Sequence, residues 1–395
     1  MASVIRLKKG LTITLQGKAE KVLSKCDAPQ LYAVQPTDFQ GIIPKLTVAE
    51  GDKVKAGSPL FYDKLRPQII FASPVSGTVS AIVRNAIKYD YPVVEAITSI
   101  LPLCDEFVVC LGNSDDGTEE LIKSLKDSVN NCENYGGGLN SVDKIKIIHS
   151  VWDDTLRTGG KVLAVETNKA FDAIAADSDW AFYIQADEVV HEKYLPVIKQ
   201  AMEQCLDNHA VECLVLKYLH FYGNYKYVGD SRNWYRREIR IVRNNKSIRS
   251  YKDAQGFRHI ANVSKHSNES SQIVDNHRFR KLNGRLIDAY VYHYGWVRNP
   301  RLQTAKQVGF EKLYNANDEK LTIKQDELVD YNKVTSLALF DGEHPKVMQP
   351  RINAMDWDFE FDTSNKNLSF KYKVLQWIEK VTGRRLFEFK NYKLV

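Results

Sequence analysis

The stretch GTVSAIVRN at residues 77–85 decides how this chain divides into domains, because two folding patterns meet in it. Before it, short alternating runs and turn residues follow one another and end in SPVSG at residues 73–77. After it, runs with helical periodicity alternate with apolar runs typical of strands. No linker separates the two patterns, so residues 77–85 fit both the last strand of a first module and the first strand of a second. We expect the larger sheet to take this strand, because it would be buried there on both faces.

The composition is that of an ordinary globular protein of two or three domains. The chain has 395 residues, of which 44% are hydrophobic and 26% charged, and a formal net charge of +6. Such a mild charge gives no reason to expect a nucleic-acid partner. We divide the chain into a β module at residues 1–76, a larger domain at residues 77–320 with residues 77–85 as a shared strand, and a C-terminal extension at residues 321–395.

Short strands dominate the first module. Alternating apolar runs lie at residues 11–15, 45–48 and 68–71, and Gly, Pro, Ser and Asp residues separate them. This pattern predicts a compact all-β unit. The larger domain instead alternates helix-like runs (residues 91–101, 118–127 and 160–176) with strand-like runs (residues 106–111, 145–148 and 180–184). That order predicts an α/β fold with a mostly parallel sheet, helices on both faces and ligands at the carboxyl ends of the strands.

The first module resembles a known family. EGDKVKAG at residues 50–57 and FASPVSG at residues 71–77 resemble the barrel-sandwich hybrid of biotinyl and lipoyl carriers. More specifically, residues 1–84 resemble the N-terminus of the NqrA subunit of the sodium-translocating NADH:quinone oxidoreductase. Carriers attach their cofactor to a hairpin lysine, but the neighbours of Lys64 differ from the carrier signature. We therefore expect Lys64 to be an unmodified surface lysine.

Acidic residues follow two of the predicted strands of the larger domain. Asp115 and Asp116 come after one strand, and Asp187 and Glu188 come after another. Carboxylates cannot bind a diphosphate directly, but they can hold a divalent cation that bridges its oxygens. They can also accept hydrogen bonds from ribose hydroxyls. The alternative for Asp116 is that it caps the helix that follows.

These acidic loops carry a second resemblance. NSDDGT at residues 113–118 looks like the Ser-x-Asp-Gly-Thr motif of family 2 glycosyltransferases, and YIQADE at residues 183–188 looks like their Asp-x-Asp metal motif. The resemblance covers about residues 80–300. It implies the GT-A fold, a Rossmann-like nucleotide-sugar-binding domain, together with Mn²⁺ or Mg²⁺ and inversion at the anomeric carbon. Gln185 replaces the first Asp of the metal motif, so metal–diphosphate binding is better supported than any particular nucleotide.

The resemblance also implies a donor site and a metal site. The residues that it places against the nucleotide-sugar are Asn85, Ser114, Asp116, Asn168, Lys169 and Gln185. The metal ligands that it implies are Asp187 and His293. From the residues alone, His293 is equally well explained as a hydrogen-bonded core histidine.

Transfer with inversion needs a carboxylate that takes the proton of the acceptor hydroxyl. Our candidates for this catalytic base are Glu238 and Asp253, with Asp230 as a third. Glu238 stands among three arginines, so the alternative is a structural acid that forms ion pairs. Arg298 and Lys306 are candidates to neutralise a diphosphate, or else they belong to a solvated helix face.

The end of the chain is basic and amphipathic. Residues 364–395 hold eight Lys or Arg against two Glu, with apolar side chains interleaved. Such a segment can lie on an anionic membrane surface. The alternative is a terminal helix and strand that pack on the domain with a solvated basic face.

Localisation follows from other features. Six cysteines without metal-site spacing favour a reducing cytosol. We find neither a signal peptide nor an apolar run long enough to span a membrane. We expect a cytoplasmic protein, either free or peripheral on the inner face of the cytoplasmic membrane.

Our main functional prediction is a metal-dependent glycosyltransferase. It would move a sugar from a nucleotide-sugar donor to a glycan or lipid-linked acceptor with inversion. The alternative is a docking module of a respiratory complex, similar to the NqrA subunit of the sodium-translocating NADH:quinone reductase, or an inactive product of gene fusion. The missing linker at residues 77–85 motivates that alternative.

Overall fold

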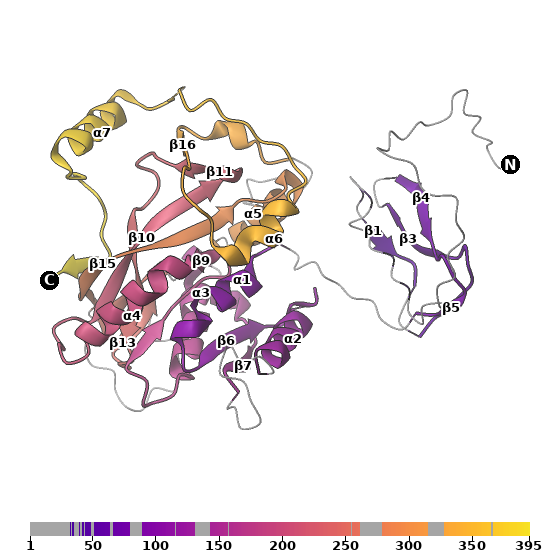
Figure 1. The fold of residues 1–395 in the computed structure, drawn as a ribbon, viewed down its shortest axis with the longest axis horizontal. Coiled ribbons are helices and arrows are strands. Elements are labelled where there is room, and N and C mark those ends of the chain that lie inside the picture. Colours follow the sequence, from indigo (N-terminus) through magenta and orange to yellow (C-terminus); the bar gives the residue numbers. More distant parts are fainter. Residues whose placement is uncertain are drawn as a thin grey trace. The chain divides into compact units, whose positions relative to one another are not determined.

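A computed structural model gives the fold, and it divides the chain into two compact units, Met1–Val83 and Arg84–Val395. Each unit is described by itself (Figure 1). The residues that the structure describes are 32, 34, 39, 42, 44–48, 51–63, 66–79, 89–114, 116–130, 143–156, 158–253, 255–260, 279–314, 328–364 and 366–395.

The first unit is built from short antiparallel strands, as its alternating sequence predicts. Its strands are β1 (Pro44–Leu46), β2 (Lys53–Val54), β3 (Pro59–Asp63), β4 (Arg66–Ala72) and β5 (Gly77–Thr78). The first sheet has the order β1-β3-β4, and β2 pairs with β5 in a second ribbon. Phe61 and Phe71 face each other across β3 and β4 with stacked rings 4.8 Å apart. The buried carboxylate of Asp63 accepts a 2.7 Å hydrogen bond from Arg66 Nε where these strands turn.

The strand at the module junction pairs inside the first unit. Thr78 lies opposite Lys53, and Gly77 lies opposite Val54. The backbone N–H of Val79 donates to Asp52 O at 2.9 Å. Our prediction that this strand joins the larger sheet is therefore wrong for Gly77 and Thr78. A partner strand nearby in the sequence is available at a low entropic cost of loop closure. Residues 80–85, and with them Asn85, lie outside the described residues.

The second unit contains a ten-stranded mixed sheet with the central order β13-β14-β15-β10-β11-β16. The strands of this sheet are β8 (Trp180–Phe182), β9 (Glu188–Val190), β10 (Cys213–Tyr222), β11 (Asn224–Gly229), β12 (Arg237–Arg243), β13 (Ile248–Tyr251), β14 (Gly256–Ile260), β15 (Phe279–Trp296), β16 (Leu337–Leu339) and β17 (Tyr392–Leu394). Strand β15 runs parallel to β10 and β17, and the other pairs are antiparallel.

Two further strands, β6 (Phe107–Gly112) and β7 (Ile145–Ser150), form a parallel pair of their own. The α/β class is thus confirmed, but the mostly parallel sheet is wrong. Strand β8, which we expected beside parallel neighbours, pairs antiparallel with β12. Side-chain periodicity locates a strand but carries no information on the direction of its partner. The described strands therefore give no support to a Rossmann-like GT-A domain.

Helices cover the sheets of the second unit (Figure 1). They are α1 (Val93–Ile100), α2 (Thr118–Asn130), α3 (Lys161–Asp172), α4 (Leu195–Gln204), α5 (Pro300–Tyr314), α6 (Gln349–Asn353) and α7 (Phe370–Thr382). The main core packs Ile198 of α4 against Leu214, Leu216 and Val291 of the central strands. Among the described residues, no helix combines the length and the apolar character that a membrane span requires.

Candidate ligand-binding cavity

The second unit contains a cavity of about 1820 Å³. The predicted site residues that line it are Ser114, Asp116, Gln185, Asp187, Asp253 and His293. Asn168, Lys169 and Glu238 are not among its lining residues. The fold therefore brings together the two acidic loops and His293, as the sequence predicted, and leaves the other three outside.

Asp187 is the most constrained side chain of the cavity wall. It is 7% exposed and lies in the turn just before β9. Lys306 of α5 donates to Asp187 Oδ2 at 2.9 Å and to the carbonyl of Gly295 at 2.9 Å. On the other side, Asp187 Oδ1 lies 3.7 Å from His293 Nε2. A lysine and an imidazole therefore flank this carboxylate.

The charges at this wall follow from burial and proximity. Burial raises the pKa of Asp187, but Lys306 and His293 outweigh burial and hold that pKa well below its usual range. Burial lowers the pKa of His293, although Asp187 partly opposes it, and burial also lowers the pKa of Lys306. The wall is therefore an Asp187–Lys306 ion pair beside a neutral imidazole.

The sheet register sets the tautomer of His293. Parallel pairing of β10 with β15 places His220 beside His293, and their Nδ1 atoms are 3.1 Å apart. His220 Nε2 lies 2.8 Å from the carbonyl of Tyr235, so Nε2 must be the donor. Burial lowers the pKa of His220 well below its usual value, so the ring is neutral and its Nδ1 accepts a hydrogen bond from His293 Nδ1. The lone pair of His293 therefore sits on Nε2, toward Asp187.

A fully buried ion pair supports this wall from behind. Arg240 donates to both carboxylate oxygens of Glu188, at 2.7 and 2.9 Å. The hydroxyl of Tyr218 donates to Glu188 at 2.8 Å. Glu188 is 0% exposed and Arg240 is 1% exposed. We expected Glu188 to face a ligand, but its lone pairs are already used within the core.

The first acidic loop caps a helix. Asp116 Oδ1 accepts from the backbone N–H of Thr118 at 3.1 Å and from its hydroxyl at 2.5 Å, and it also accepts from Ser114 Oγ. This geometry satisfies a free N–H at the start of α2. The capping interpretation of Asp116 thus describes its contacts, although both Ser114 and Asp116 also line the cavity. Asp115 lies outside the described residues.

Two other predicted donor-site residues make contacts within the protein. The side-chain amide of Asn168 bridges α3 to the backbone of Ser250, at 2.8 and 3.3 Å. Lys169 Nζ donates to Glu166 and to Ser150, both at 2.7 Å. At the cavity wall, the amide of Gln185 donates to the hydroxyl of Tyr183 at 3.2 Å.

The candidate bases lie apart from one another. Asp253 lines the cavity and accepts a 3.1 Å hydrogen bond from the hydroxyl of Tyr314. Glu238 is buried and accepts hydrogen bonds from the backbone of Ile239 and from Asn391, each at 3.0 Å. Burial raises the pKa of Glu238 to about 6. Among the described residues, Glu238 forms none of the ion pairs that we had considered.

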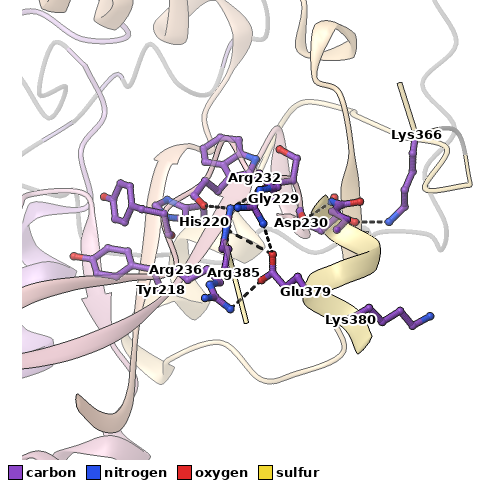
Figure 2. Close-up of a pocket in the computed structure, with 14 residues that line it drawn as sticks. Tyr218, His220, Gly229, Asp230, Arg232, Arg236, Lys366, Glu379, Lys380 and Arg385 are labelled. Carbon is purple, nitrogen blue, oxygen red and sulfur yellow. Dashed lines mark hydrogen bonds and ion pairs between the residues drawn. The ribbon is translucent and has the colours of Figure 1, made fainter. Parts of the chain in front are cut away.

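A second cavity of about 380 Å³ lies beside α7 (Figure 2). Its most densely charged part is a cluster that we call the arginine cluster, made of Arg232, Arg236, Arg385 and Glu379. Arg232 and Arg236 each place a guanidinium nitrogen 2.9 Å from the Glu379 carboxylate, and Arg385 approaches it at 3.7 Å. The sequence offers no signal for this cluster, because Glu379 lies 147 residues from Arg232.

The class of the first unit is clear from its strands and its sequence together. Residues 5–89 match the family described as the NqrA N-terminal barrel-sandwich hybrid domain. Three relatives are NqrA subunits of Na(+)-translocating NADH-quinone reductases. That of Histophilus somni is 43% identical over 83 residues, that of Mannheimia succiniciproducens 42% over 83 residues, and that of Pasteurella multocida 41% over 83 residues. The match covers 21% of this chain and 19% of each relative, so the chain spans about a fifth of their length.

These matches overturn our main functional prediction. They point to a function like that of the NqrA subunit, which was our alternative, and not to a metal-dependent glycosyltransferase. The motifs that misled us have local roles, since Asp116 caps α2 and Asp187 pairs with Lys306. That the chain is an enzyme and that it uses Mn²⁺ or Mg²⁺ stay predictions. Within the described residues, no group of three His, Cys, Asp or Glu side chains is arranged to hold a metal.

Proposed function

We propose that the first unit is a docking module by which the chain binds an oxidoreductase complex of the Na(+)-translocating NADH-quinone reductase type. The observation that carries this proposal is the 43% identity over 83 residues with the NqrA subunit of such a reductase. The matched segment is one small β unit without the rest of that protein, and a unit of this size more readily supplies a binding surface than a complete catalytic site.

The described strands offer a surface for docking. Ile70 on β4 is 57% exposed, and Leu46 on β1 is 38% exposed. The core underneath is occupied by the stacked rings of Phe61 and Phe71. An exposed aliphatic side chain on a sheet with an aromatic core is a suitable anchor for a protein partner, because burying it on binding removes apolar surface from water.

The test uses the full chain and a purified reductase that lacks its own NqrA subunit. We expect the two to co-elute, and purified NqrA to compete. Ile70→Asp should weaken binding by about tenfold or more, because a charge would enter an apolar contact. Leu328→Asp is the matched control, since Leu328 lies in the second unit and is 61% exposed. Absence of co-elution, or equal loss in both variants, would contradict the proposal.

We propose a second activity for the cavity, the binding of a divalent cation by Asp187 and His293. The supporting observation is that His293 Nε2, whose lone pair the His220 contact leaves free, lies 3.7 Å from Asp187 Oδ1. Two lone-pair donors that face each other favour a cation between them. Such an ion would take its other ligands from water or a bound anion, which it would polarise as a Lewis acid. Lys306 competes for the same carboxylate.

Titration of the purified chain with Mn²⁺, followed by electron paramagnetic resonance, tests this second proposal. Asp187→Asn should abolish tight binding. Lys306→Gln should strengthen binding, because it removes the competing ammonium. Asp230→Asn serves as a control, since Asp230 lines the other cavity. Unchanged Mn²⁺ affinity in Asp187→Asn would refute the assignment.

A further inference from the structure

Helix α7 is attached to the second unit through its polar face. Glu379 pairs with Arg232 and Arg236, and Gln376 donates to the backbone carbonyl of Asp230 at 3.3 Å. None of the residues of α7 is buried. An amphipathic helix of a globular protein normally turns its apolar face to the core, so α7 has the reverse orientation.

The apolar stripe of α7 faces outward as a consequence. Phe370, Val374, Trp377 and Val381 are spaced i, i+4, i+7 and i+11, which places them on one face of the helix. Their exposed fractions are 82%, 40%, 65% and 64%. Glu379 lies two residues after Trp377 and so points to the opposite side. These four side chains form the surface that we call the outer stripe.

The chain after α7 continues this surface. Gly383 ends the helix in the left-handed conformation, with φ 66°. Phe387 is 90% exposed and also has a positive φ of 59°, and Phe389 is 74% exposed. A bulky residue rarely holds a left-handed backbone, so the exposure of Phe387 comes with strain. Burial of that ring against a partner would compensate for this strain.

The charges around the outer stripe are positive. Lys371, Lys373, Lys380 and Arg384 are all exposed. Figure 2 shows Lys380 pointing away from the arginine cluster. The one acid of α7, Glu379, is held by that cluster on the other face. The outward face of α7 therefore combines aromatic and aliphatic side chains with cations only.

We propose that the outer stripe of α7, together with Phe387 and Phe389, binds the surface of a membrane that contains anionic lipids. Trp and Phe favour the boundary between headgroups and acyl chains, and flanking Lys and Arg attract anionic headgroups. A protein partner with an acidic groove would need fixed carboxylates opposite each cation, whereas a fluid anionic surface satisfies scattered cations without such a match. This inference is independent of the docking module, since it uses only the second unit.

The experiment is co-sedimentation of the full chain with vesicles of phosphatidylglycerol and phosphatidylcholine in equal amounts. We expect binding that falls as salt is added and that is weak with phosphatidylcholine alone. Trp377→Ser should weaken binding about tenfold, because it removes the largest apolar side chain from the stripe. Lys373→Glu should weaken it about tenfold as well, because a cation becomes an anion.

Two control variants separate the stripe from general surface effects. Leu328→Ser removes an apolar side chain that is 61% exposed elsewhere, and Lys199→Glu reverses a charge on α4. Both should bind vesicles as the unaltered chain does. Because all four substituted side chains are exposed, melting temperatures should agree. Equal binding to neutral and anionic vesicles, no loss in Trp377→Ser, or burial of the stripe in a stable dimer detected by light scattering would each overturn the proposal.

Discussion

Two carboxylates of the second unit are each held by arginine, and they differ in burial. Glu188 pairs with Arg240 at 0% and 1% side-chain exposure, behind the wall of the larger cavity. Glu379 pairs with Arg232 and Arg236, and its own side chain is 22% exposed. The Glu188 pair lies among core strands, whereas the Glu379 pairs join a surface helix to the body of the unit.

The difference shows how burial changes the consequence of one kind of contact. In the core, loss of one partner leaves a charge without water, so the whole fold loses stability. At the surface, water and neighbouring acids replace the missing partner, so the loss is small and local. We therefore expect the Glu188 pair to set stability and the arginine cluster to set the orientation of α7. The four predictions below test that division, beginning with the largest effect.

Glu188→Ala should lower the free energy of unfolding by about 3–5 kcal/mol, because Arg240 would remain buried without its partner. Urea unfolding followed by tryptophan fluorescence measures this. Glu360→Ala is the control, since Glu360 forms an exposed pair with Lys226 and its loss should cost less than about 1 kcal/mol. Similar losses in the two variants would break the comparison.

Asp187→Asn should lower the free energy of unfolding by about 3 kcal/mol at neutral pH, because Lys306 loses its charged partner in a buried wall. Lys306 and His293 hold the pKa of Asp187 below its usual range despite burial. The stability from ionised Asp187 is therefore fully present above about pH 4 and is lost as pH falls through the lowered folded pKa. Unfolding curves at neutral and acidic pH should show the two proteins converging in acid. A constant gap would contradict this.

Glu238→Gln should have the opposite pH dependence. Burial raises the pKa of Glu238 to about 6, so the folded state prefers the protonated acid. The wild-type chain therefore loses stability as pH rises from the unfolded pKa through about 6, by about 2 kcal/mol. The Gln variant should be more stable than wild type above that range and equal to it well below. A gain that does not vary with pH would exclude ionisation as its cause.

Glu379→Ala should have the smallest global effect, about 1 kcal/mol, because Glu388 still pairs with Arg236. The local effect should be larger. Without its anchor, α7 should exchange amide hydrogens faster than α4, which packs on the core. Hydrogen exchange read by mass spectrometry measures both helices in one sample. Faster exchange in α4 as well would show that the cluster stabilises the whole unit.

Local elements could be predicted from the sequence, and sheet topology could not. We expected a helix at residues 118–127, and α2 spans Thr118–Asn130; we expected a strand at residues 145–148, and β7 spans Ile145–Ser150. Both follow from the spacing of neighbouring side chains. The antiparallel pairing of β8 with β12 joins segments far apart in the chain. Such pairing depends on long-range packing, which periodicity does not encode.

The cavity shows the same limit at the level of single residues. The sequence indicated that Asp187 and His293 would meet, and both line one cavity. It did not indicate that His220 would set the tautomer of His293 from 73 residues away. The parallel register of β10 and β15 brings the two rings together, and no local pattern in either strand predicts that register.

The class of the first unit can be read from its residues alone, because the 83-residue similarity to NqrA is carried by strands and turns that pair locally. The basic and amphipathic character of the end of the chain is equally plain from its residues. Which face of α7 points outward depends instead on long-range contacts. Glu379 sets that face through ion pairs with arginines nearly 150 residues earlier in the chain, and a distant partner of this kind leaves no mark on the periodicity of the helix itself.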